Sequence, residues 1–75
     1  MDFKKVTDDL FARIDHSDLA EAMGISVPTI RQARLGPDAK AHRSPPPGWE
    51  KAALKLAEAQ ARHFERLARR LHEST

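Results

Sequence analysis

Residues 19–35 read LAEAMGISVPTIRQARL, and this stretch decides the fold because one glycine separates two apolar helical patterns. Leu19 and Met23 lie four residues apart before Gly24, and Ile30 and Ala33 follow it at helical spacing. Glycine enters the left-handed backbone region without steric cost, so it can end one helix and redirect the chain within a few residues. The pattern predicts two short helices joined by a tight turn.

Capping residues set the limits of these two helices. Asp15 is a suitable N-cap for a helix that runs to about Met23. Ser26 is a suitable N-cap for the next helix, and Pro28 falls in its first turn, where a missing amide hydrogen is tolerated. A Gly-Pro pair then stops this helix near Leu35.

The flanking segments also predict helices. Phe3, Val6, Leu10 and Ile14 recur at three- and four-residue intervals, which predicts a first helix ending near Ile14. Residues 36–48 form a basic, proline-rich loop by composition, and residues 49–75 return to a helical pattern. The expected fold is all-α: a compact three-helix unit over residues 1–35, followed by a long C-terminal helix. Trp49 is expected to pack against the prolines and the first helix, rather than to stack on a nucleic-acid base.

The C-terminal segment is too long for the preceding helices to cover. About 25 helical residues extend about 37 Å at 1.5 Å per residue. Apolar residues alternate three- and four-residue steps along it, which is the seam spacing of a coiled coil. We expect this seam to form a homodimer, with the domain-facing side carrying Leu56 and Leu67 instead. The predicted dimerisation residues are Leu54, Ala57, Ala61, Phe64, Ala68 and Leu71.

Charge is distributed unevenly, although the net charge of the chain is only +2. Residues 1–30 carry three basic and six acidic side chains, for a net charge of −3. Residues 31–48 carry four basic side chains against one acidic side chain, for a net charge of +3. A local basic patch beside an acidic segment suits a polyanionic partner that contacts one face of the molecule.

Composition argues against several other classes of function. The chain has no cysteine, which removes disulfides and thiolate metal sites and fits a cytoplasmic, nucleoid-associated protein. No apolar run is long enough to span a bilayer, so no membrane partner is expected. The histidines lack metal-ligand spacing, and the hydroxyls of Ser26 and Thr29 lack a partnered base. We therefore expect no catalytic residues, no metal, no cofactor and no small-molecule effector.

Residues 16–35 resemble the helix-turn-helix of the lambda-repressor/Cro-like (XRE-type) DNA-binding family. Ala20 matches the small residue where the two helices of that family cross closely, and Gly24 matches its turn glycine. Pro28 departs from the family pattern, because members often use this position for a polar side chain that contacts a base. Five apolar residues match the positions that the family buries between its helices: Leu19, Met23, Ile25, Ile30 and Ala33.

The resemblance implies that the helix after Gly24 enters the major groove of double-stranded DNA. Packing the apolar faces of the two helices against each other is expected to leave the polar residues on the outer face. Val27 and Arg34 are expected on the same face. Arginine can bridge guanine O6 and N7, glutamine can bridge adenine N6 and N7, and an apolar group can meet a thymine methyl. The predicted base-reading residues are Ser26, Val27, Thr29, Arg31 and Gln32. The predicted phosphate contacts are His16, Ser17, Arg34, Lys40 and Arg43.

These features favour a sequence-specific transcriptional regulator of bacterial or phage type. It would bind a palindromic operator as a homodimer and repress by covering a promoter. The alternative is a helical adaptor or anti-regulator that binds another protein through the same exposed helices. Helix-turn-helix scaffolds can serve either purpose, so the sequence leaves both open.

Overall fold

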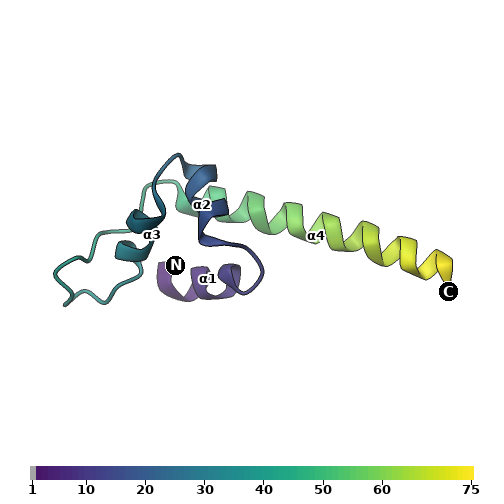
Figure 1. Cartoon of the computed structure of the whole chain (residues 1–75), viewed down its shortest axis with the longest axis horizontal. Coiled ribbons are helices and arrows are strands. Elements are labelled where there is room, and N and C mark those ends of the chain that lie inside the picture. Colours follow the sequence, from purple (N-terminus) through teal and green to yellow (C-terminus); the bar gives the residue numbers. More distant parts are fainter. Residues whose placement is uncertain (1) are drawn as a thin grey trace.

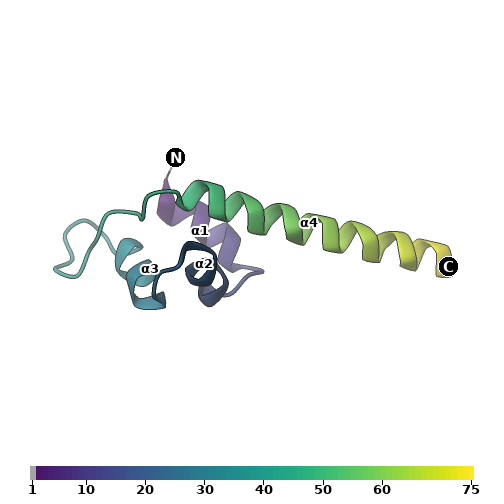
Figure 2. The same cartoon turned by 90° about the horizontal axis from the view of Figure 1, so that it is seen from above.

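The computed structural model describes residues 2–75. The regular secondary structure of these residues is all helical, with no strand. The helices are α1 (Phe3–Phe11), α2 (His16–Met23), α3 (Val27–Ala33) and α4 (Trp49–Ser74). The first three gather around the N-terminal half of α4, whose C-terminal half projects away from them (Figures 1 and 2). The principal dimensions, 54 × 21 × 19 Å, reflect this projection. We call residues 2–60 the body and residues 61–74 the tail.

The short helices of the body begin at well-formed caps. The carboxylate of Asp2 accepts hydrogen bonds from the backbone N–H groups of Lys4 and Lys5, at 2.9 and 3.3 Å. Asp15 precedes α2, and its backbone N–H donates to Asp18 Oδ2 at 3.2 Å, as a capping box requires. These bonds satisfy amide groups that the first turn of a helix leaves unpaired. The predicted N-cap at Asp15 is confirmed.

One small core lies where the helices of the body meet. Leu19, Ile30 and Thr7 are fully enclosed, and the Thr7 hydroxyl donates to Phe3 O at 2.6 Å. This bond satisfies the polar group that α1 buries. The buried apolar residues are Phe3, Leu19, Ala20, Ile30, Ala33, Trp49 and Ala53.

Trp49 ties the start of α4 to α1 and to the proline-rich loop. Its ring meets Phe3 edge to face, with ring centroids 5.0 Å apart and an interplanar angle of 86°. Its backbone N–H donates to the carbonyl of Pro46, which is itself buried. Gly48 precedes it at a φ of +82°, a left-handed conformation that favours glycine. The structural role predicted for Trp49 is confirmed.

Two helix ends and one leucine differ from expectation. α1 ends at Phe11, not near Ile14, because the chain must turn before it reaches the extended N-cap at Asp15. α3 ends at Ala33, one to two residues early, which is the usual uncertainty of helix ends. Leu56 packs against the core as predicted, but Leu67 is exposed because it lies beyond the reach of the body.

No helix among residues 2–75 combines the length and apolar character that a bilayer-crossing segment needs.

Candidate nucleic-acid interface and adjoining groove

The turn between α2 and α3 is built around Gly24. Its φ of +67° is left-handed, and the Ile25 N–H donates to Ala20 O at 3.0 Å across the turn. A side chain on Gly24 would meet nothing within 4 Å, so the need for glycine is conformational and not steric. The turn sets Leu19 and Ala20 of α2 against Ile30 of α3, all of them buried.

Ser26 starts α3 as predicted. Its hydroxyl accepts from the Thr29 N–H at 3.3 Å and lies 2.8 Å from the Thr29 hydroxyl. Pro28 occupies the first turn, where no intrahelical N–H bond is needed. Two predicted base-reading residues therefore already bond to each other, so a base would compete with this contact.

Fewer residues lie on the outer face of α3 than the sequence predicts. Arg31 is exposed, and Gln32 is half-buried beside it. Val27, expected on the outer face, packs against the core because the first turn of α3 approaches the body. Arg31, Gln32 and the Ser26–Thr29 pair are the predicted base-reading residues that keep an outward surface.

Arg34 also differs from its expected place on the outer face, because its guanidinium turns back onto α1. Nη1 donates to the Thr7 hydroxyl at 2.6 Å, and Nη2 donates to Asp8 Oδ1 at 2.5 Å. The guanidinium carbon lies 5.1 Å from the centroid of the Phe11 ring, within cation–π range. Only 18% of the side chain is exposed. In this conformation Arg34 holds α3 to α1, and it would have to leave these partners to contact a phosphate.

The carboxylate of Asp8 is held by two cations. Lys4 Nζ lies 2.8 Å from Oδ1, and Arg34 shares the same oxygen. The hydrogen bond from Lys4, followed by that from Arg34, keeps the pKa of Asp8 below its ordinary value. Sequence reasoning missed the Asp8–Arg34 pair, because 26 residues separate the partners and no local pattern connects them.

His16 stacks on Phe11 at the start of α2, with ring centroids 3.8 Å apart. Burial, followed by the positive charges of Arg34 and Arg31, lowers the pKa of His16 below its ordinary value of 6.5. The neutral ring is therefore favoured, and a neutral imidazole can contact a phosphate only by hydrogen bonding. Ser17, the neighbouring predicted phosphate contact, is exposed.

The loop that carries Lys40 and Arg43 is attached to the C-terminal end of α3. The Arg43 N–H donates to Gln32 O at 3.2 Å, and His42 Nδ1 lies 2.9 Å from Leu35 O. These contacts occupy carbonyls that the end of a helix leaves unpaired. The side chains of Lys40 and Arg43 lie in exposed positions, next to the end of α3 that also carries Arg31.

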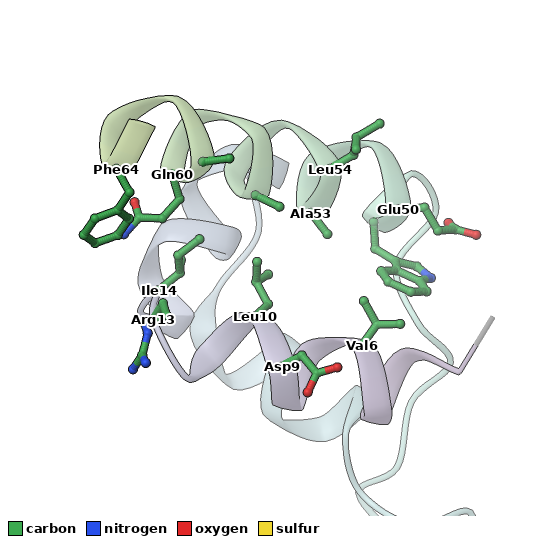
Figure 3. Close-up of a pocket in the computed structure, with 13 residues that line it drawn as sticks. Val6, Asp9, Leu10, Arg13, Ile14, Glu50, Ala53, Leu54, Gln60 and Phe64 are labelled. Carbon is green, nitrogen blue, oxygen red and sulfur yellow. The ribbon is translucent and has the colours of Figure 1, made fainter. Parts of the chain in front are cut away.

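A separate apolar groove of about 700 Å³ runs between α1 and α4. Figure 3 shows Val6 and Leu10 of α1, with Ile14 of the following turn, on one side and Ala53 and Phe64 of α4 on the other. Four predicted seam residues line this groove: Leu54, Ala57, Ala61 and Phe64. Ala68 and Leu71 continue the seam along the tail and are exposed. The α4 side of the groove was predicted from the seam spacing, whereas the α1 side was not, because the apolar stripe of residues 3–14 was used only to predict a helix.

Comparisons with protein-family models, with curated proteins and with solved structures found no match.

Proposed function

We propose that the protein is a sequence-specific, double-stranded-DNA-binding transcriptional regulator whose reading head is α3. The observation that carries this proposal is the α2–Gly24–α3 unit. Its left-handed glycine and its buried Leu19–Ile30 packing leave Arg31 exposed on a capped helix. A helix held in this way by a preceding helix and a tight turn can enter the major groove, which is wide enough to admit it.

The arrangement of positive charge supports the same proposal. Arg31, Lys40 and Arg43 are exposed, and the bonds of the loop to α3 keep the loop beside that helix. Arg31 and Gln32 would read bases, while Lys40 and Arg43 would contact phosphates and set the register. Thr29 and Ser26 would contribute after breaking their mutual hydrogen bond. His16 and Ser17 would contact the backbone from the start of α2, and Arg34 would support α3 from behind.

The proposed unit would act as a homodimer on a palindromic operator and repress by occluding a promoter. The seam on α4 supports this part of the proposal, because Leu54, Phe64 and Leu71 remain 49–58% exposed in one chain. We propose no catalytic role and place the protein with the nucleoid in the cytoplasm.

One observation favours the alternative of a protein-binding adaptor or anti-regulator. The apolar groove between α1 and α4 is a surface that a helix of another protein could occupy. In that case α3 would be a structural helix, and Arg31 would be a solvated side chain.

Selection of bound fragments from random duplex DNA tests the proposal, and Arg31→Ala and Gln32→Ala test the reading head. Each good bidentate base contact discriminates by about 1–3 kcal/mol, so each variant should lose much of its preference for the selected sequence over scrambled duplex. Arg66→Ala is the matched control, since Arg66 is also an exposed arginine but lies on the tail, outside α3. If no sequence is enriched, or if both variants match the wild type, the adaptor becomes the better proposal.

A further inference from the structure

The tail is an apolar stripe with nothing to cover it in a single chain. From Ala61 to the end of α4 every residue is exposed, including Phe64 at 49% and Leu71 at 57%. The first turn of the tail, with Ala61 and Phe64, borders the groove beside α1, but the rest of the tail projects away from α1, α2 and α3 and is not covered by them (Figure 1). Its partner must therefore come from another molecule if the stripe is to be buried.

The groove of the body is the complementary feature. Its walls are apolar side chains of α1 and of the N-terminal half of α4, and its rim carries Asp9, Arg13 and Glu50. Leu10 and Ile14 are half-buried on the wall opposite α4 (Figure 3). An α-helix with an apolar stripe is the natural occupant of such a groove.

We propose that the occupant is the tail of a second copy of this chain, inserted antiparallel and reciprocally, so that each tail fills the groove of the other protomer. This arrangement rests on the homodimer of the proposed function and specifies its geometry. Leu54 then faces the partner's Leu71, Ala57 faces the partner's Ala68, and Ala61 faces the partner's Phe64. A two-fold axis makes every such contact occur twice.

The sizes of the seam residues favour this register. The largest seam residue, Phe64, meets Ala61 of the partner, which is a small residue. A large side chain therefore fills the space that a small one leaves. A parallel dimer would instead place Phe64 on the partner's Phe64 and would leave three layers of alanine against alanine, whereas the antiparallel register leaves two, because the Ala57–Ala68 layer occurs twice. The antiparallel register distributes side-chain volume more evenly along the interface.

The charges favour the same direction. The tail carries four arginines against two glutamates, whereas residues 2–30 carry three basic and six acidic side chains. These arginines lie on the flank and back of the seam. They therefore attract the other protomer by longer-range electrostatics and not by contacts within the groove. An antiparallel dimer sets each basic tail beside α1 of the other protomer, in the acidic segment of residues 2–30, whereas a parallel dimer sets the two basic tails side by side.

The area that must be buried is the third reason. A strip of α4 about 39 Å long and about 10 Å wide supplies about 400 Å² per chain, or about 800 Å² per dimer. Stable interfaces bury about 1,200–2,000 Å² in total. Contacts of each tail with the α1 wall, made by Leu10 and Ile14, supply additional area. In the antiparallel arrangement the groove of each protomer covers the whole tail of the other. A parallel dimer leaves both tails outside the grooves.

The arrangement also places the two proposed reading heads far apart along the dimer. In this register the two Trp49 residues lie about 40 Å apart along the helix axis, at 1.5 Å per residue. α3 lies at the end of the molecule remote from the tail (Figure 1), so the two copies of α3 lie toward opposite ends of the dimer.

Cysteine cross-linking tests the proposal without background, because the natural chain has no cysteine. Full-length Leu54→Cys and Leu71→Cys proteins are oxidised separately and as an exchanged mixture. A disulfide needs Cβ atoms about 3.5–4.5 Å apart, so the antiparallel register gives covalent dimer in the mixture and little in either protein alone. Arg62→Cys and His63→Cys, mixed in the same way, keep the register but lie on the back face, and this control should not cross-link.

Three other outcomes overturn the proposal. Cross-linking of each single variant with itself means a parallel dimer, which leaves the proposed DNA-binding function standing. A wild-type protein that sediments as a dimer but gives no cross-link in the mixture means that another face dimerises. A monomer at high micromolar concentration removes the dimer altogether. Cross-linking in the mixture without enrichment of any DNA sequence would support the dimer and refute the regulator.

Discussion

The body and the tail contain similar apolar side chains, but only the body covers them. Leu19 and Ile30 are fully buried in the body, whereas Leu71 in the tail is 57% exposed. α1, α2 and α3 have only seven to nine residues each and would be marginal as isolated helices. The tail, in contrast, consists mainly of strong helix formers such as alanine, leucine, arginine and glutamate. Helix formation therefore depends on tertiary packing in the body and mainly on local preference in the tail.

The largest expected effect comes from truncating one buried side chain in the body. Ile30→Ala should cost about 2–5 kcal/mol of the free energy of unfolding, because it removes a fully buried side chain between α2 and α3. A domain of this size has little stability to spare. We expect Ile30→Ala to lose much of its cooperative thermal transition, measured by circular dichroism.

The matched change in the tail should act on assembly instead. The Phe64→Ala, Leu71→Ala double variant should sediment as a monomer while its body keeps a cooperative transition at low protein concentration. Both side chains are about half-exposed in a single chain, so their burial is expected on association. Unfolding of the body in this double variant would mean that body and tail are one cooperative unit, and the comparison would fail.

A smaller effect is expected from two arginines, one in each region. Arg34→Met keeps an aliphatic side chain but loses the bonds to Thr7 and Asp8 and the cation–π contact with Phe11, so it should cost about 1–2 kcal/mol of stability. Arg69→Met in the exposed tail should change stability within about 0.5 kcal/mol. Denaturant titrations of both variants measure the two changes in the free energy of unfolding. Equal effects would show that the Arg34 contacts are not structural.

The smallest expected effect concerns the pH dependence of the body. The folded protein lowers the pKa of His16 below 6.5, so the unfolded chain binds the proton more readily. The contribution of His16 to stability is therefore complete above pH 6.5 and declines as the pH falls below that value through the lower folded pKa. His16→Phe preserves an aromatic ring against Phe11 but cannot titrate. Denaturant midpoints across this range should be flatter for His16→Phe than for the wild type, and parallel curves would refute this role.

Local signals in the sequence predicted much of the fold. Asp15 and Ser26 were found as caps, Gly24 as the turn residue and Trp49 as the start of α4, because each meets a requirement of its own few residues. The exposed seam on α4 also follows from local spacing and from the length of the helix. The places of Val27 and Arg34 could not be predicted in this way, because their partners lie elsewhere in the chain.

An all-helical chain, a glycine turn at residue 24 and a long apolar stripe on the last helix all follow from the order of residues. Helical period, capping and left-handed glycine act over a few residues, so they can be read from the order of residues alone. Packing between the helices, in contrast, determines that Arg34 turns inward to Thr7 and Asp8, and that α1 supplies one wall of the groove beside α4. These features depend on the angles at which short helices cross, and those angles are set by side chains that meet across more than twenty residues of sequence.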